Sequence, residues 1–355
     1  MLRIEMLRAG HGDCLWLEYG DPQAPRRVLI DGGATGTYKR ALRERLRGLP
    51  PEQRRFELLA VTHIDADHIA GILDLLADPE MGFRATDIWF NGYRHLPDEK
   101  PETLGPVQGE RLTDLLVKPG VTWNGEFRKA AAVVPVDGAL PRAELEGGLV
   151  LTLLSPTPGK LAVLKPVWDQ EVRKAGLDPS QPRPGEVESP EGFELLGAPD
   201  VEALAAEPFS EDDAVANGSS IALLAEFEGR RVLLTGDAHP GILTASIKRL
   251  AGGGRLAVDA CKLPHHGSKA NVSRQFLQTL DCSKWLFSSS GAYFRHPDRQ
   301  AVARVITWGG AKPELSFNYR TQYNDVWDSK PLRERHGYAV SYPKSEAEGL
   351  VLEWR

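Results

Sequence analysis

The segment VTHIDADHIAG, residues 61–71, places two histidines and two aspartates within six positions. It follows the apolar run FELLA, which is typical of a buried strand. Burying uncompensated charge is costly, so four ionisable side chains at a strand end require a compensating partner. His63 and Asp65 project to one side of an extended segment, and Asp67 and His68 begin a predicted helix. Imidazoles and carboxylates in this arrangement indicate a site for a divalent metal.

Two later predicted strands also end in side chains that can bind metal. VLLTGD ends in Asp237, and CKLPHHGS contains His265 and His266, followed by Gly267 and Ser268. Side chains at strand ends along one edge of a sheet can converge, whereas scattered surface histidines cannot. The sequence therefore predicts one metal site built from three strand ends.

Each of these motifs also has a purely structural explanation. Asp67 could cap the following helix, Gly-Asp after a strand is ordinary turn chemistry, and the paired histidines could be satisfied core residues. Capping explains one aspartate of the first motif and leaves its other three residues unexplained. Of the histidine pair, we expect His265 to be the metal ligand and His266 to be a substrate contact or an alternative ligand.

The rest of the chain favours a single domain over residues 1–355 with alternating strand and helix patterns. Between residues 156 and 217, proline and acidic residues are frequent, as in LDPSQPRPGEVESPEG. Such a segment has little to bury and is predicted to be a loop or a partly ordered insertion. Long loops on a rigid scaffold often carry specificity, so we expect this insertion to overhang the site.

Composition excludes several classes of protein. The net charge of −6 argues against a large basic surface for nucleic acid, although a narrow groove remains compatible. Three widely separated cysteines indicate neither a disulfide framework nor a cysteine zinc site. No apolar stretch approaches the ~20 residues that a membrane span needs, so we expect a cytoplasmic protein without a membrane partner. No protein partner is predicted.

The order of the motifs carries a resemblance to a known family. HxDxDH, then a strand-terminal TGD and a strand-terminal HHGS, resembles the metallo-β-lactamase superfamily, whose first motif is usually HxHxDH. The nearer resemblance is to the metallo-β-lactamase-like domain of the DNA-uptake protein ComEC and its soluble relatives. GHGDCLWLE, LIDGG, NGSSIALL and the late His296-Pro297 follow that family's order, over roughly residues 8–297. The resemblance implies a four-layer αββα sandwich with the site at one edge of the sheets.

The resemblance also implies roles for individual residues. The expected metal ligands are His63, Asp65, Asp67, His68, Asp237 and His265. Asp237 would bridge two metals. The superfamily commonly supplies another histidine between the first motif and Asp237, whereas this sequence has only His95 there. One or two bound ions are therefore compatible with the sequence.

Other residues are candidates for supporting roles. Asp31, in LIDGG, could orient a ligating histidine from behind or could be a turn residue, and Asp13 is similar. We expect Asp67 and His296 to be catalytic, with His296 protonating a leaving group. The expected substrate contacts are His266, Ser268, Asn217 and Ser219.

The predicted activity is hydrolysis by a metal-activated water. Asp65, where most of the superfamily has histidine, hardens the first site, so manganese and iron join zinc as candidate ions. The resemblance favours a phosphodiester substrate, either a small nucleotide or a nucleic-acid strand. A carboxylic ester, lactone or thioester hydrolase is the alternative enzyme. A metal-binding or regulatory module without turnover also remains open.

Overall fold

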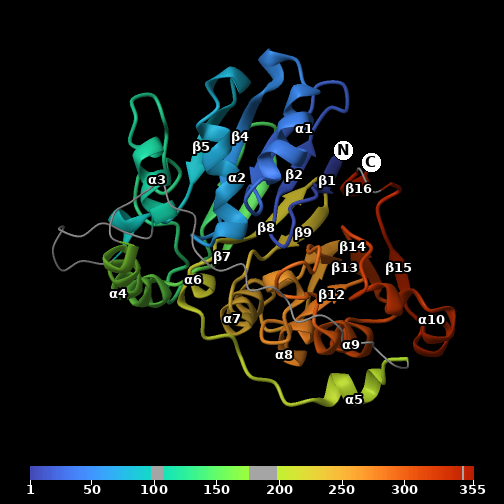
Figure 1. The fold of residues 1–355 in the computed structure, drawn as a ribbon. Helices are drawn as coiled ribbons and strands as arrows, with labels where there is room; N and C mark the ends of the chain where they lie inside the picture. Colours follow the sequence, from blue (N-terminus) through green and yellow to red (C-terminus); the bar gives the residue numbers. More distant parts are fainter. Residues whose placement is uncertain (97–106, 176–197, 346–347) are drawn as a thin grey trace.

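Two sheets lie face to face in the computed structural model, which describes residues 1–96, 107–175, 198–345 and 348–355 (Figure 1). In spatial order the first sheet contains β16 (Leu350–Trp354), β1 (Leu2–Met6), β2 (Leu15–Tyr19), β3 (Arg26–Ile30), β4 (Arg55–Ala60) and β5 (Arg84–Trp89). The second contains β15 (Ala339–Ser341), β14 (Glu314–Phe317), β13 (Lys284–Phe287), β11 (Ala260–Lys262), β9 (Arg230–Leu234), β8 (Ala222–Phe227), β7 (Val150–Ser155) and β6 (Arg142–Glu144). A separate pair contains β10 (Leu256–Val258) and β12 (Leu280–Cys282).

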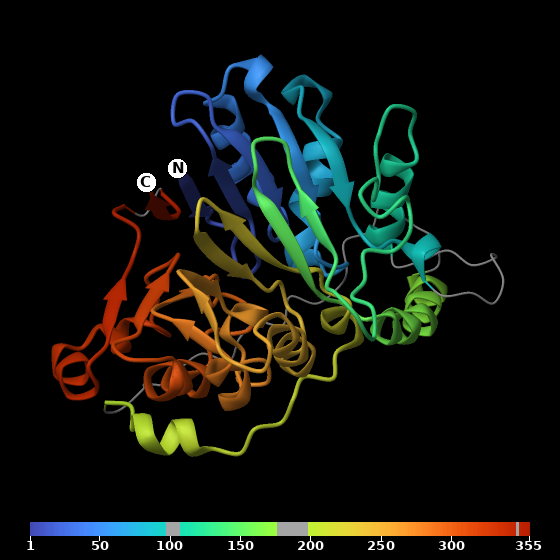
Figure 2. The same cartoon turned by 180° about the vertical axis from the view of Figure 1, so that it is seen from behind.

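Helices cover the outer face of each sheet (Figures 1 and 2). The first sheet is covered by α1 (Arg43–Arg47), which a π-helical turn over Tyr38–Leu42 precedes, and by α2 (Ala66–Leu76) and α3 (Val107–Leu116). The second is covered by α7 (Pro240–Leu250), α8 (Arg274–Gln278) and α9 (Arg299–Trp308), and α10 (Lys330–His336) lies near its β15 end. The predicted four-layer αββα sandwich is confirmed.

Side-chain alternation along the strands explains this layering. On β2, Leu15 and Leu17 pack into the core between the two sheets, whereas Trp16 points to the opposite face and joins the cluster beneath the helices. On β3, Val28 and Leu29 divide in the same way. Successive strand side chains point to opposite faces, so a strand that is apolar on both faces must lie between two layers.

Parallel pairing brings the ends of several strands to one edge. β3 pairs with β4, and β9 with β11 and β11 with β13, all in parallel. The carboxyl ends of parallel strands lie at the same edge of a sheet. The segments that follow β3, β4, β9, β11 and β13 therefore lie at one edge of the sandwich, and these segments contain the motifs described above.

The expected insertion at residues 156–217 is helical over much of its described length. It contains α4 (Pro158–Ala175), α5 (Val201–Ala206) and α6 (Val215–Gly218), and residues 176–197 lie outside the described residues. The helix α4 forms because Leu161, Leu164 and Trp168 bury an apolar stripe in the cluster beside α3. That the insertion overhangs the site and sets substrate choice stays a prediction. Among the described residues, no helix is long and apolar enough to cross a membrane.

Candidate metal centre

Three side-chain atoms from three different strand ends form a nearly equilateral triangle at this edge. His68 Nε2 lies 3.3 Å from His266 Nε2 and 3.3 Å from Asp237 Oδ2, and His266 Nε2 lies 3.4 Å from Asp237 Oδ2. Ligands about 2.1 Å from a tetrahedral zinc ion are about 3.4 Å from one another. The three atoms are therefore spaced as the ligands of one metal ion.

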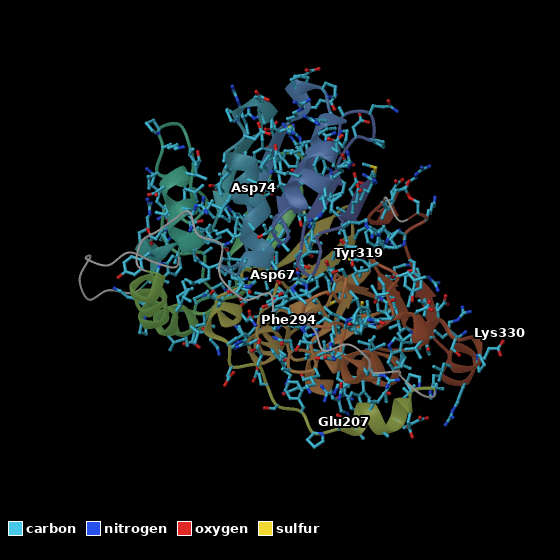
Figure 3. All side chains as sticks on the ribbon, in the orientation of Figure 1. Asp67, Asp74, Glu207, Phe294, Tyr319 and Lys330 are labelled. Atoms are coloured by element: carbon cyan, nitrogen blue, oxygen red, sulfur yellow. The ribbon has the colours of Figure 1, made fainter. Side chains whose placement is uncertain are left out.

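Asp67 adds a fourth atom beside this triangle. It lies in the first turn of α2, at the inner end of that helix (Figure 3). Its Oδ2 is 3.4 Å from His266 Nε2 and 3.9 Å from His68 Nε2. We call His68, His266, Asp237 and Asp67 the inner site. All four side chains are buried, and two imidazoles with two carboxylates form a donor set suited to zinc, manganese or iron.

The two imidazoles of the inner site are fixed from behind. His68 donates from Nδ1 to Asp31 Oδ2 over 2.8 Å, and Asp31 in turn accepts hydrogen bonds from the backbone N–H and the hydroxyl of Thr62. His266 donates from Nδ1 to the Ser288 carbonyl over 2.8 Å. Both Nε2 atoms are thereby left to face the inner site, as metal-binding histidines require. Asp31 occupies the orienting position that the sequence left open.

A buried ion pair stands next to the inner site. Lys262, at the end of β11, is fully buried, ion-pairs with Asp13, donates to the Gly236 carbonyl over 3.1 Å and lies 3.8 Å from Asp237 Oδ1. Asp13 also lies 3.3 Å from His266 Nδ1. Asp13, His68, Asp237 and His266 form a cluster whose ligand atoms are within 4.8 Å of one another. Because Asp13 faces Lys262 and the rear of His266, we assign it to orientation and not to metal binding.

Sequence reasoning missed Lys262, although a signal was present. A lysine within the apolar strand segment DACKLP has no solvent to reach, so it needs a buried anion. Asp212, described below, lacked any such signal because it lies in an acidic, proline-containing stretch.

A second, looser group of atoms lies beside the inner site, next to the His68 ring. His63 Nε2 is buried without a hydrogen-bond partner, 3.5 Å from Asp65 Oδ2 and 4.0 Å from Asp237 Oδ2. The side chain of Asp65 is 45% exposed. Buried polar atoms without partners are costly, so these atoms also fit a metal ion, held by fewer and more exposed ligands than at the inner site.

A polar network holds the Nδ1 side of His265 and leaves its Nε2 farther from Asp237 than the Nε2 atoms of His68 and His266. His265 Nδ1 lies 3.1 Å from Asn271 Oδ1 and 3.4 Å from Asp212 Oδ2, and its Nε2 lies 3.9 Å from Asp237 Oδ2. Asp212 also accepts hydrogen bonds from Asn217 Nδ2 over 2.7 Å and from Asn271 Nδ2 over 3.0 Å. This geometry favours His266 over His265 as the ligand, the reverse of the order that we expected from sequence.

Of the expected substrate-contact residues, Ser219 and Ser268 form hydrogen bonds within their own turns, whereas Asn217 faces His265. The hydroxyl of Ser219 donates to the Ala216 carbonyl over 2.6 Å, and that of Ser268 accepts from the Ala270 N–H over 3.2 Å, so both serve their own turns. Asn217 faces His265, and its Oδ1 is buried without a partner. Ser220 accepts from the backbone N–H of Asp237 over 3.3 Å and helps to place that carboxylate.

His296 lies beside both histidines of the HHGS motif. Its ring centroid is 5.3 Å from that of His265 and 6.5 Å from that of His266, and its Nδ1 is 3.7 Å from Asp298 Oδ2. Burial lowers the pKa of His296, and Asp298 acts in the opposite direction. His95 lies outside this group: its ring packs against Trp123, and its Nδ1 accepts from the Gly92 N–H.

Comparison by sequence finds no relative: no model of a known protein family matches the chain, and no curated protein matches it. Solved structures do resemble it. The metallo-β-lactamase fold protein YhfI from Bacillus subtilis has 11% identity and a TM-score of 0.46, over 99% of this chain and 100% of that one. The neighbouring structures are metallo-β-lactamase fold proteins.

Two further neighbours are similar at the same level. Zn²⁺-bound PqqB from Methylobacterium extorquens has 13% identity and a TM-score of 0.40, over 96% of this chain and 87% of that one. The short form of human tRNase Z has 9% identity and a TM-score of 0.44, over 99% of this chain and 98% of that one. Similarity this distant gives no information about the ligands or the reaction of this chain.

Electrostatics of the inner site favour a bound cation. Burial lowers the pKa of His68 and His266, but Asp237 and the other nearby carboxylates outweigh burial and raise both pKa values well above normal. Burial also raises the pKa of Asp237, yet the surrounding imidazoles hold it well below its usual range. The inner site therefore contains an ionised carboxylate among imidazoles on which the nearby carboxylates favour positive charge. A divalent ion bound at this position would supply that positive charge.

Proposed function

We propose that this protein is a metal-dependent hydrolase and that its substrate is a phosphodiester. The observation that supports it best is the triangle of His68 Nε2, His266 Nε2 and Asp237 Oδ2, with mutual distances of 3.3, 3.3 and 3.4 Å. The Nδ1 atoms of both imidazoles are held by Asp31 and by the Ser288 carbonyl, so protein contacts orient both rings.

The inner site would hold the first ion, and His63, Asp65 and Asp237 would hold a weaker second one. A bound divalent ion would supply water with a pKa lowered to ~7 and would polarise the scissile phosphoryl group. Zinc, manganese and iron all suit a donor set of imidazoles and carboxylates. The carboxylate Asp65 in place of an imidazole favours the harder ions at the second position.

The remaining residues of the centre have roles that follow from their placement. Asp31 and Ser288 keep the two ligand rings in orientation, and Lys262 with Asp13 fixes the wall behind Asp237 and His266. His265 is 22% exposed at its side chain and faces the same space, so it would contact an anionic substrate. His296, next to it, would supply a proton to the leaving group.

The choice of a phosphodiester rests on two arguments. The ordered motifs GHGD, LIDGG, HxDxDH, TGD and HHGS resemble those of the ComEC-like domains. In addition, two neighbouring metal positions that share Asp237 would suit in-line displacement at phosphorus. The small net charge of −6 favours a nucleotide or a narrow groove over a long nucleic-acid track.

The test compares two substrates across added metals. Protein purified without chelator is assayed for bound metal, then for hydrolysis of bis-p-nitrophenyl phosphate and of p-nitrophenyl esters with Mn, Zn or Fe. We expect bound transition metal and preference for the phosphodiester. Preference for the carboxylic ester would support an esterase, and absence of both metal and turnover would favour a binding module.

A matched pair of variants on one helix separates the site from the scaffold. Asp67 and Asp74 both lie on α2, but Asp67 is at the inner site and Asp74 is exposed (Figure 3). Asp67→Asn should remove most of the activity, whereas Asp74→Asn should not. Equal activity in both variants would mean that the hydrolysis comes from another site or another protein.

A further inference from the structure

Two exposed aromatic rings lie close to the metal centre. Tyr293 and Phe294 lie between β13 and α9 and are 43% and 49% exposed, which is high for side chains of this size. Their ring centroids are 4.5 Å apart with the planes at 81°. Figure 3 shows Phe294 near Asp67 in the projection of the molecule.

Other rings hold this pair from below. His11, from the GHGD motif, stacks on Tyr293 with a centroid distance of 5.2 Å and an angle of 27°. Phe294 stacks on His296 with a centroid distance of 5.9 Å and the same angle. The backbone is also closed locally, because Arg295 N–H donates to the Gly291 carbonyl. We call Tyr293 and Phe294, with His11 and His296 beneath them, the aromatic platform.

The aromatic platform is continuous with the metal centre. A single ring, that of His296, separates Phe294 from the inner-site ligand His266, whose ring centroid is 6.5 Å from that of His296. The GHGD segment that carries His11 also lies beside the centre, because the N–H of Asp13 donates to the Asp67 carbonyl over 3.2 Å. A substrate with its reacting group at the inner site would therefore extend its neighbouring group over Phe294.

We propose that the aromatic platform is a stacking subsite for the base of a nucleoside phosphodiester. This inference rests on the proposed phosphodiesterase function and specifies its substrate. Planar rings gain from offset and edge-to-face contact with aromatic side chains, which a flexible acyl chain does not match. Stacking accepts any base, because every base has a π-face. The subsite would therefore recognise a nucleotide without selecting its sequence.

The test uses two phosphodiesters with the same leaving group. Thymidine 5′-(p-nitrophenyl phosphate) carries a base, and methyl p-nitrophenyl phosphate does not. For the wild type we expect a higher kcat/KM and a lower KM for the thymidine ester. Phe294→Leu should lower the ratio of the two kcat/KM values by roughly 5- to 150-fold, the range for losing one base stack. Phe294→Trp should keep the ratio.

A control variant tests whether any exposed phenylalanine would do the same. Phe209 is 40% exposed and lies under the guanidinium of Arg304 on α9, and no ring contact among the described residues joins it to the aromatic platform. Phe209→Leu should leave the ratio unchanged. A dinucleotide and a single-stranded oligonucleotide, assayed in the same way, then distinguish a small substrate from a polymer.

A binding measurement separates this inference from the proposed function. Binding of thymidine 5′-monophosphate is followed by saturation-transfer NMR in EDTA and with added metal, for the wild type and Phe294→Leu. If neither ester is hydrolysed, the phosphodiesterase proposal fails, but nucleotide binding that weakens in Phe294→Leu still supports the subsite. Binding or a substrate ratio that is the same in the wild type and Phe294→Leu would overturn the aromatic platform as a base subsite.

Discussion

Replacing Lys262 by methionine is expected to destabilise the protein by about 3–5 kcal/mol, the cost of breaking one side of a buried ion pair. The Lys262 side chain is fully buried, and its partners Asp13 and Asp237 are only 1% and 2% exposed. Methionine fills nearly the same space without charge. The variant therefore leaves the Asp13 carboxylate buried without its cation and removes the cation nearest to Asp237 Oδ1.

Urea unfolding in EDTA measures this effect without the contribution of a bound ion. Adding Asp13→Asn to Lys262→Met removes the second charge of the pair, so the double variant should be more stable than Lys262→Met alone. The expected coupling between the two positions is up to ~3 kcal/mol. Lys284→Met is the control, because Lys284 pairs with Glu314 at a partly exposed position on the neighbouring strand and such pairs contribute ~1 kcal/mol or less.

Two results would refute this reasoning. A loss below ~1 kcal/mol for Lys262→Met would mean that the ammonium does not compensate buried carboxylates. Strict additivity of Lys262→Met and Asp13→Asn would mean that the two side chains do not interact.

The remaining predictions concern the histidines. Isothermal titration with Zn²⁺ measures the metal affinity of the two histidine variants. His266→Asn should lose most of the affinity, whereas His265→Asn should retain it. A greater loss of affinity in His265→Asn would make His265 the ligand. Asp31→Asn should weaken metal binding about 10- to 100-fold, because His68 loses its orienting carboxylate, and an unchanged affinity would contradict that role. Burial lowers the pKa of His95 to about 4, below its value of 6.5 in the unfolded chain. The unfolded chain therefore takes up a proton on this ring at a higher pH than the folded protein does. The stability that the neutral ring contributes is complete above pH 6.5 and is lost as the pH falls towards 4. His95→Gln should flatten the stability profile in that window by about 3 kcal/mol in urea unfolding, and a profile parallel to that of the wild type would exclude the effect.

The position of the site could be predicted because it depends on periodicity. Apolar runs that end in HxDxDH, TGD and HHGS identify three strand ends, and parallel pairing then brings strand ends to one edge. The αββα layering follows from the same patterns, since strands such as β2 and β3 are apolar on both faces. Helix α4 was not expected, because the proline-rich composition of residues 156–217 outweighed the apolar stripe of Leu161, Leu164 and Trp168.

The choice between the two adjacent histidines could not be predicted from sequence. His265 and His266 have φ values of 47° and 54°, in the left-handed region that few residues other than glycine adopt. Neither the strand period nor the helix period describes a turn of this kind, so the directions of the two rings cannot be inferred from spacing. The ring of His266 is fixed by the Ser288 carbonyl and that of His265 by Asn271 and Asp212. Ser288 and Asp212 are distant in sequence from the two histidines.

Charge balance explains why so many carboxylates gather at one strand edge. Lys262 pairs with Asp13 and lies 3.8 Å from Asp237 Oδ1, whereas no lysine or arginine contacts Asp31 or Asp67 among the ion pairs of the described residues. Imidazoles can compensate them only by taking up protons, which is why these carboxylates raise the pKa of His68. A divalent ion supplies two positive charges at the same Nε2 atoms and requires those atoms to be unprotonated. Protons and a metal ion therefore compete for the same Nε2 atoms. The same carboxylates favour both the protonated histidines and the bound metal ion.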